Sequence, residues 1–350
     1  MSRDERREDL MFVSMLKKVV RGESLTLNEA YESACLLLHG EVPTAQAAAF
    51  LAVLRARKET GTELSGFVQA LYQEAIMVDT GLEVLDTCGT GGDGMGTFNI
   101  STAASLVAAA CGVPVAKHGN RAVTGKVGSA DVLEAMGVNI QLSPDESRHM
   151  LDKVGITFLF APNYHPILKQ VGGLRREMGV MTIFNFLGPL LNPFKPAFQV
   201  MGIADPDLLQ SVAQTSITTG RERVLVVHAD NGMDEISPVG PTRIHDANTR
   251  ETSEYSFNPS SVGISPFPLN LINGGDADTN ATIIKNVLSG RQGPHRDAVV
   301  INTAAALLAS GKAHDFNTGM LLAGEAIDSG RALKKLHQMI DFSRDGVKVC

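Results

Sequence analysis

The sequence predicts an α/β protein in which a small all-helical domain precedes a large α/β domain with a mainly parallel central sheet flanked by helices. The N-terminal part carries helical periodicity and helix-capping residues throughout. From about Val84, short apolar runs alternate with helical periods, which is the pattern of α/β units around a largely parallel sheet. With 350 residues, 44% of them hydrophobic, the chain can bury a large core in one or two domains.

Residues that begin helices mark the N-terminal part. Thr26 and Glu29 stand as a capping box before the run AYESACLLLHG, and Thr44 is placed to cap the helix AQAAAFLAVLRAR. The segment GTELSGFVQALYQEAIM continues the helical period. The pattern then changes, so we expect a domain boundary near Asp79 to Leu82.

Six apolar runs are predicted to form the strands of the sheet, with helices between them. In the helix SPDESRHMLDKVG, Ser143 is the predicted cap and Pro144 lies in the first turn. Between Tyr164 and Pro193 the sequence is helical and then irregular, so this segment is a candidate to cross back to the first domain. The predicted strands are EVLDTC, VPVAK, GVNIQL, ITFLFA, FQVMGI and RVLVVHA.

The composition argues against several classes of partner. The chain has 31 Lys and Arg against 38 Asp and Glu, and its net charge of -7 gives no general attraction to nucleic acid or an anionic membrane. The four cysteines form no CxxC pair, which suits a reducing compartment. The first residues, MSRDERREDL, are charged where a signal peptide is apolar, and no apolar run reaches the ~20 residues of a membrane span. We therefore expect a cytoplasmic protein.

The stretch DTCGTGGDGMGTFNISTAA contains five glycines within eight residues. Gly89, Gly91 and Gly94 formally spell the GxGxxG dinucleotide fingerprint, but the next helix is expected to start later, near Ile100. Lys117 and His118 stand about where the fingerprint requires an acidic residue. We therefore reject a dinucleotide site.

A phosphate or pyrophosphate is the ligand that this first loop suits best. Its glycines allow backbone N–H groups to approach an anion, and Asn99, Ser101 and Thr102 lie at a helix N-terminus, which favours negative charge. Asp93 is embedded among the glycines. The alternative is a tight turn followed by a capped helix that binds no ligand.

A second loop, within KHGNRAVTGKVGSADVLEAMGV, concentrates positive charge in an acidic protein, which suggests an anion pocket. Its glycines permit close backbone approach, and Ser129 and Asp131 can cap the following helix. Because both loops follow consecutive strands, they are expected to share one crevice. For His118 alone, the alternative is a structural histidine. The basic residues are Lys117, His118, Arg121 and Lys126, and the glycines are Gly119, Gly125 and Gly128.

The adjacent acids Asp234 and Glu235 form a third candidate site. They follow the predicted strand RVLVVHA and a turn at Gly232, which places them at the carboxyl edge of the sheet, where α/β proteins bind ligands. Paired carboxylates there suit Mg²⁺. A solvated turn is the alternative.

Seven strings resemble, in the same order, the anthranilate phosphoribosyltransferase family, and the likeness spans nearly the whole chain. They are GTGGD, NISTAAS, KHGNRAV, GSADVLEAMGV, FLFAPNYHP, RREMGVMTIFNFLGPLLNP and MDEIS, followed by GGDADTNA. The resemblance implies a cytoplasmic homodimer that uses magnesium, two ions per subunit, to transfer phosphoribose from 5-phosphoribosyl 1-diphosphate to anthranilate in tryptophan biosynthesis. It also implies a helical domain of residues 1–79 plus part of 166–192, and an α/β domain of residues 80–165 and 193–350, with the active site between them.

The resemblance also implies which residues form the site. Ser101, Asp234 and Glu235 would be the metal ligands, Lys117 and Arg121 would stabilise the departing pyrophosphate with the metal, and no general base is assigned. Asn120 and Arg175 would contact anthranilate, whose path His118 and His165 would line. The residues implied to bind the substrates are Gly89, Gly92, Asp93, Thr97, Asn99, Ile100, Ser101, Thr102, Lys117, His118, Gly119, Asn120, Arg121, Ala122, Val123, Thr124, Gly125, Ser129, His165 and Arg175.

The second loop departs from the family pattern. The family's usual KHGNRAVSSKSGSAD has serines where this chain has Thr124, Gly125 and Val127. Gly125 and Val127 each remove a hydroxyl and its possible hydrogen bond, worth about 0.5–1.5 kcal/mol. Three alternatives therefore stay open: a transferase for a substituted anthranilate or another amine, a pyrimidine nucleoside phosphorylase, which shares the fold, and a nucleic-acid-binding paralogue without transferase activity.

Overall fold

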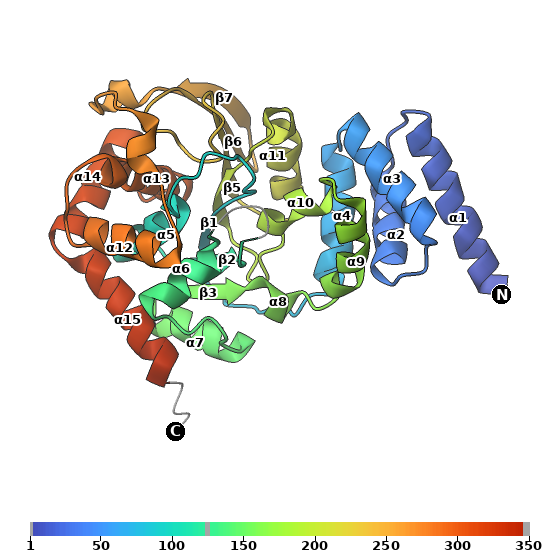
Figure 1. Cartoon of the computed structure of the whole chain (residues 1–350), viewed down its shortest axis with the longest axis horizontal. Coiled ribbons are helices and arrows are strands. Elements are labelled where there is room, and N and C mark those ends of the chain that lie inside the picture. The colour runs from blue at the N-terminus through green and yellow to red at the C-terminus, as the bar shows by residue number, and fades with distance from the viewer. Residues whose placement is uncertain (1–2, 123–126, 346–350) are drawn as a thin grey trace.

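The computed structural model describes residues 3–122 and 127–345 (Figure 1). Four N-terminal helices form a bundle at one end of the molecule, and the sheet with its covering helices forms the other end. None of the described helices is long and apolar enough to cross a membrane. The bundle helices are α1 (Arg3–Val20), α2 (Leu27–Leu38), α3 (Thr44–Arg57) and α4 (Gly61–Gln73).

The caps of the bundle helices test the sequence predictions directly. The capping box of α2 is confirmed, because the Glu29 backbone N–H donates to Thr26 Oγ1 at 3.3 Å and the Thr26 N–H donates to Glu29 Oε2 at 2.7 Å. The predicted cap at Thr44 is wrong. Helix α3 begins at Thr44 itself, after Pro43, and no side chain caps it.

Within the described residues, seven strands form one sheet in the order β3-β2-β1-β4-β5-β6-β7. The first five in this order are parallel, and β6 and β7 add an antiparallel edge, so the predicted mainly parallel sheet is confirmed. The strands are β1 (Leu85–Gly89), β2 (Val115–Gly119), β3 (Ile156–Phe160), β4 (Phe198–Gly202), β5 (Arg223–Ala229), β6 (Thr242–Asn248) and β7 (Thr252–Phe257).

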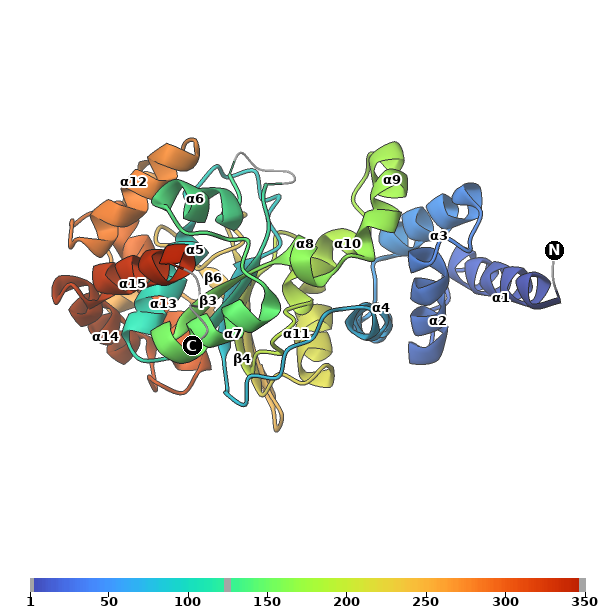
Figure 2. The same ribbon diagram turned by 90° about the horizontal axis from the view of Figure 1, so that it is seen from below.

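The remaining helices cover both faces of the sheet or connect it to the bundle (Figure 2). The α-helices are α5 (Ile100–Ala110), α6 (Ser129–Met136), α7 (Pro144–Val154), α8 (Ala161–Tyr164), α9 (Leu168–Met178), α10 (Phe184–Leu187), α11 (Leu209–Thr218), α12 (Ala277–Leu288), α13 (Pro294–Ala309), α14 (Phe316–Asp328) and α15 (Arg331–Asp345). The 3₁₀ helices are η1 (Gly188–Leu190), η2 (Pro206–Leu208), η3 (Pro259–Val262) and η4 (Leu269–Ile272).

Strand β5 shows how the two faces of the sheet bury apolar side chains. Because successive side chains point to opposite faces, Leu225 and Val227 join the core under α5 and α13, whereas Val224 and Val226 join a second core with α4 and α11. This second core continues into the bundle. Thr215 on α11 donates its hydroxyl to the Gly61 carbonyl of α4 at 3.0 Å, and α9 packs on α2 and α3.

Two strand predictions failed for physical reasons. The run GVNIQL is not a strand: its Asn139 N–H donates to the Ser343 hydroxyl at 3.0 Å instead of to a neighbouring strand. Strands β6 and β7 were not predicted because β7 is mostly exposed and β6 has only two apolar residues, Ile244 and Ala247, so neither gives an apolar run. The predicted cap Ser143 and the Pro144 first turn of α7 are confirmed.

Candidate active site

The site lies where the order of the strands reverses. After β1 the chain adds β2 and β3 on one side of the sheet, and it then returns to place β4 on the other side of β1. In open α/β sheets such a point leaves a crevice at the carboxyl ends of the strands. Here the loop after β1 is tied to the end of β4, since the Thr90 N–H donates to the Gly202 carbonyl at 2.9 Å.

The first loop, residues 89–99, contacts the turn that follows β5. This turn carries Asp234 and Glu235 and is called the acidic turn below. Its Gly91 N–H donates to Asp234 Oδ2 at 2.7 Å, and Asp93 accepts from the Asp234 N–H at 3.4 Å. Gly91 and Gly92 have φ of 65° and 80°, a backbone region that favours glycine. The glycines therefore give the loop its shape and leave backbone N–H groups near the carboxylates.

Glycine also permits the close approach of Asp234 to the sheet. A Cβ on Gly202 would lie 1.5 Å from the Asp234 carbonyl oxygen, and a Cβ on Gly89 would lie 2.4 Å from Asp234 Oδ2. Any larger residue at Gly202 would have to displace the backbone of the acidic turn. Gly202 was not among the predicted site residues, although its place at the end of a predicted strand was a usable signal.

Helix α5 begins at Ile100, as the sequence predicted, and Asn99 occupies the cap position. The Ser101 N–H, in the first turn, donates to Glu235 Oε1 at 3.2 Å. A carboxylate is favourable there because the helix N-terminus carries partial positive charge. The side chains of Ile100 and Thr102 are buried. The Thr102 hydroxyl has no hydrogen-bond partner within the described residues.

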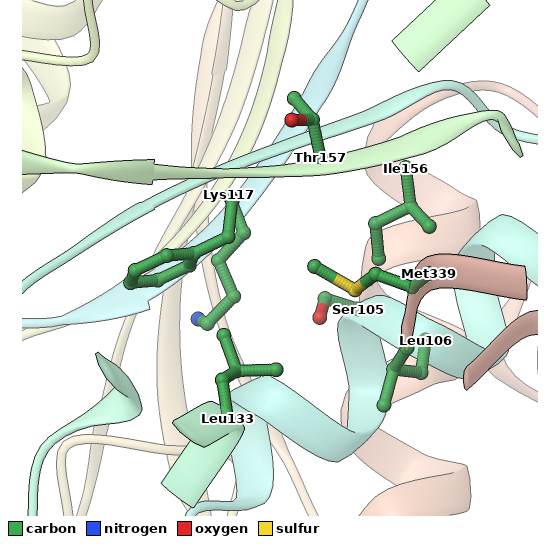
Figure 3. Close-up of a pocket in the computed structure, with 8 residues that line it drawn as sticks. Ser105, Leu106, Lys117, Leu133, Ile156, Thr157 and Met339 are labelled. Carbon is green, nitrogen blue, oxygen red and sulfur yellow. The ribbon is translucent and has the colours of Figure 1, made fainter. Parts of the chain in front are cut away.

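Lys117 reaches the same place from β2. Its side chain is only 3% exposed and runs along a pocket lined by Leu106, Leu133, Phe158 and Met339 (Figure 3). The Nζ donates to the Ser101 hydroxyl at 3.3 Å and to the Thr87 carbonyl. Apolar packing thus fixes the stem of this lysine and points its charge at the first turn of α5.

The base of the second loop is closed by Asp131. Its Oδ2 accepts from the Ala122 N–H at 3.0 Å and from the Gly128 N–H at 2.8 Å, so the predicted capping role of Asp131 is confirmed. Ser129 is not the cap, because α6 starts at Ser129 and Gly128 holds the cap position. Gly119 allows Ser129 to approach, since a Cβ on Gly119 would lie 2.2 Å from the Ser129 hydroxyl.

Arg121 points toward helix α6. Its guanidinium pairs with both carboxylate oxygens of Glu134, one at 2.9 Å, and with Asp131 at 3.4 Å. Asn120 is exposed, and its side-chain oxygen accepts from the Arg121 N–H at 2.8 Å. The predicted binding residues Val123, Thr124 and Gly125 lie outside the described residues.

Carboxylates crowd together at the acidic turn. Burial, and then the neighbouring Asp93, raise the pKa of Asp234. Burial, and then the charge of Asp234, raise the pKa of Glu235. The positive charge of Lys117 acts against this rise. A cation relieves such crowding of negative charge. The hydroxyl-bearing residue Ser101 lies beside Glu235. The described residues contain no group of three or more His, Cys, Asp or Glu placed as a complete metal cage. This donor set fits Mg²⁺, which takes one or two carboxylates and completes its shell with phosphates and water.

Helix α13 holds the acidic turn from behind. The Asn302 side chain accepts from the Ile236 N–H and donates to the Ile236 carbonyl, both at 2.9 Å. It also donates to the Ala298 carbonyl, and it is 3% exposed. Nothing in the sequence around Asn302 had pointed to this role, because its partner lies 66 positions away.

His118 and His165 form a buried pair on the other side of β2. Their ring centroids lie 5.4 Å apart, and His165 Nε2 bonds the Leu191 carbonyl at 2.8 Å. Within the described residues, His118 Nε2 and His165 Nδ1 have no hydrogen-bond partner. Burial lowers the pKa of His165 to about 4 and holds the pKa of His118 well below its usual range. Both rings are therefore neutral at pH 7.

Arg175 lies on α9, at the bundle end of the molecule. Its guanidinium carbon is 5.9 Å from the Phe184 ring centroid, and burial lowers its pKa. In the part of the chain that the structure describes, no ion pair or hydrogen bond joins Arg175 to either glycine-rich loop. The structure thus joins the first loop directly to the acidic turn and links Lys117 to that turn through Ser101, while Arg175 stands apart.

Comparisons with known proteins agree with this architecture. The helical bundle domain of the glycosyl transferase family matches residues 13–75, and the α/β domain of that family matches residues 81–333. The chain belongs to this family. Relatives narrow the assignment to the anthranilate phosphoribosyltransferases, which confirms the resemblance found in the sequence.

The chain is 61% identical over 340 residues to an anthranilate phosphoribosyltransferase of Syntrophomonas wolfei, and the match covers 97% of this chain and 100% of the relative. The crystal structure of that enzyme from Thermus thermophilus has a TM-score of 0.88 and 39% identity, covering 94% of this chain and 99% of the other. The enzyme from Saccharomyces cerevisiae in complex with PRPP and Mg has a TM-score of 0.87 and 27% identity, covering 96% and 98%.

Proposed function

We propose that this chain transfers the phosphoribosyl group of 5-phosphoribosyl 1-diphosphate to the amine of anthranilate. The products are N-(5-phosphoribosyl)anthranilate and pyrophosphate, in the second step of tryptophan biosynthesis from chorismate. The observation that carries the proposal is the meeting of a glycine-rich loop, a helix N-terminus, a buried lysine and a carboxylate turn at the point where the strand order reverses. The family assignment leaves the nucleoside phosphorylase and the nucleic-acid-binding alternatives without support.

The first loop and the start of α5 would hold the diphosphate. Backbone N–H groups of the loop and of the first turn of α5 suit phosphate oxygens. Lys117 supplies positive charge beside them, and the residues of the second loop complete the contact. The side chains of Ile100 and Thr102 are buried, so we assign these two positions to backbone contacts.

The residues that would hold magnesium are Asp234, Glu235 and Ser101. We propose two magnesium ions per subunit. A bound magnesium ion neutralises the negative charge that develops on the departing pyrophosphate. The protein contributes by keeping the two carboxylates together through the Gly91 and Ser101 N–H groups.

The transfer breaks one bond and forms another at the sugar C1. The bond between the sugar C1 and the pyrophosphate oxygen breaks, and its electron pair leaves with pyrophosphate. The anthranilate nitrogen donates its lone pair to C1 and afterwards loses a proton to solvent. Lys117 and Arg121 would stabilise the leaving group electrostatically. To do so, Arg121 must give up its ion pair with Glu134 and bind the pyrophosphate instead.

The acceptor would lie between β2 and the α8–η1 segment. His118 and His165, both neutral and buried, would line the path of anthranilate there, and within the described residues His118 Nε2 and His165 Nδ1 have no hydrogen-bond partner. Arg175 and Asn120 would bind the carboxylate, which fits the fork of a guanidinium. The positioning of both substrates is expected to provide much of the rate acceleration.

The remaining expectations form part of the same proposal. We assign residues 1–79 and part of 166–192 to the helical domain, and residues 80–165 and 193–350 to the α/β domain. The packing of α9 on α2 and α3 supports this division. We further propose a cytoplasmic homodimer whose partners are the two small-molecule substrates, with no nucleic acid or membrane.

The loss of anthranilate fluorescence tests the function. Purified protein with 5-phosphoribosyl 1-diphosphate and Mg²⁺ should consume anthranilate, and omission of either should stop the reaction. The double variant Asp234→Asn with Glu235→Gln should lose activity, whereas Asp230→Asn, an exposed carboxylate on the same connection, should behave like the wild type. Unchanged fluorescence with the wild type and all components present would overturn the proposal.

A further inference from the structure

The segment GGDADTNA, residues 274–281, lies outside all the residues assigned to the site, yet it is built into the first loop. Thr97 bridges to Asn273, the Gly274 N–H donates to the Gly96 carbonyl at 2.9 Å, and the Phe98 N–H donates to the Ile272 carbonyl at 3.3 Å. A Cβ on Gly274 would lie 2.8 Å from Phe98 Cα. The approach to α12 therefore forms one wall of the loop.

Two asparagine amides then connect α12 to both glycine-rich loops. The Gly275 N–H donates to Asn280 Oδ1 at 2.7 Å, Asn280 Nδ2 donates to Asn99 Oδ1 at 2.9 Å, and Asn99 Nδ2 donates to the Val127 carbonyl at 3.1 Å. Each amide accepts through its oxygen and donates through its nitrogen. The backbone groups at the two ends, the Gly275 N–H and the Val127 carbonyl, therefore fix the direction of all three hydrogen bonds.

The environment of this chain of hydrogen bonds indicates a specific role. Asn280 is only 2% exposed, so each of its polar atoms requires a partner. Asn99 occupies the cap position of α5 but makes no capping hydrogen bond with its side chain, which is used for the bridge instead. Helix α12 packs on α6, the helix that follows the second loop (Figure 2).

We propose that Asn280 is a positioning residue for the transferase reaction. It orients the Asn99 amide and thereby sets the distance between the loop after β1 and the base of the loop after β2. This inference rests on the proposed function, because those loops are the ones assigned to the diphosphate.

A purely structural role for Asn280 is the competing explanation. In that case Asn280 would only anchor the first turn of α12 through the Gly275 N–H. The substitution Asn280→Asp separates the two roles. It keeps an oxygen acceptor for Gly275 but removes the donor to Asn99, whose amide would have to rotate and give up the Val127 carbonyl. Asn280→Ala removes both hydrogen bonds.

Steady-state kinetics provide the main test. For Asn280→Asp we expect the KM for 5-phosphoribosyl 1-diphosphate to rise roughly tenfold and more than the KM for anthranilate, because a donor is lost and a negative charge is added. Asn286→Ala, the same kind of side chain on the same helix, is the matched control. If Asn280→Asp matches the wild type while Asn280→Ala is impaired, Asn280 is only an anchor and the proposal fails.

A double-mutant cycle tests the partner. If Asn280 acts through Asn99, Asn280→Ala should raise the KM in the wild-type background but add little in an Asn99→Ala background. Additive effects would contradict the proposed connection.

Hydrogen–deuterium exchange in the ligand-free protein separates this inference from the proposed function. Asn280→Asp should speed exchange in residues 90–99 and 127–131 while the far strands stay protected. A wild type that ignores anthranilate would overturn the function but leave this readout valid. Unchanged exchange in both loops would overturn the positioning role, whatever the activity.

Discussion

The diphosphate side and the acceptor side of the candidate site are built differently. The diphosphate side, formed by the first loop, Lys117 and the acidic turn, is charged, and its polar groups are tied to several elements. The proposed acceptor side combines two neutral, buried rings, His118 and His165, with the guanidinium of Arg175, and within the described residues one ring nitrogen of each histidine has no hydrogen-bond partner. The contrast suggests that the protein gathers several charged groups where the departing diphosphate would be stabilised, and offers the aromatic acceptor neutral rings with one positive charge for its carboxylate.

Gly202→Ala should have the largest effect, because it attacks the diphosphate side through the backbone. The added Cβ would lie 1.5 Å from the Asp234 carbonyl oxygen, so the acidic turn must move. We expect activity to fall more than about 100-fold and stability to fall by about 1–3 kcal/mol. Anthranilate consumption and urea unfolding measure the two effects. Gly240→Ala, which meets nothing within 4 Å, is the control, and equal activities of the two variants would contradict the account.

Asn302→Ala should be next, since it removes the support behind the acidic turn. The variant leaves the buried Ile236 N–H and carbonyl without their partner, which should cost about 2–4 kcal/mol of unfolding free energy. It should also raise the Mg²⁺ concentration needed for half-maximal activity. Urea denaturation and a magnesium titration measure these outcomes, and a variant as stable as the wild type would count against the role of Asn302.

His165→Gln should change the pH dependence of stability from the acceptor side. Because the folded pKa of His165 is about 4 and the unfolded value is about 6.5, the unfolded state binds more protons as pH falls between these values. This histidine therefore destabilises the fold at pH 4 but not at pH 7. In the His165→Gln variant, the loss of unfolding free energy between about pH 6.5 and pH 4 should therefore be smaller by on the order of 2–3 kcal/mol.

The test is urea unfolding at pH 7 and at pH 4.5, with the exposed His314→Gln as the control. If His165→Gln loses as much stability on acidification as the wild type does, the neutral buried acceptor side is not the cause of that loss.

Glu134→Gln should have the smallest effect. It weakens a partly exposed ion pair that holds Arg121 away from the diphosphate, and such pairs contribute about 0–1 kcal/mol. We expect the KM for 5-phosphoribosyl 1-diphosphate to fall about twofold, and the difference from the wild type to shrink in high salt. A rise in KM would mean that Glu134 supports Arg121 in its binding position.

Local sequence determined much of this protein. The capping box of α2, the start of α5 at Ile100 and the acids after Gly232 were all predictable, because caps, glycine turns and strand ends are encoded by residues a few positions apart. The proposal that the first loop binds phosphate rests on the same local chemistry. The family resemblance then supplied the reaction and the proposed roles of the individual residues.

Only the tertiary structure decided the contacts between distant segments. Asn280 and Asn99 are 181 positions apart, and the clash that keeps Gly202 a glycine involves a turn from another strand. The polar strands β6 and β7 were missed, and GVNIQL was wrongly predicted as a strand, for the same reason. Their states depend on which neighbour pairs with the backbone, and the chain acquires that neighbour only when it folds.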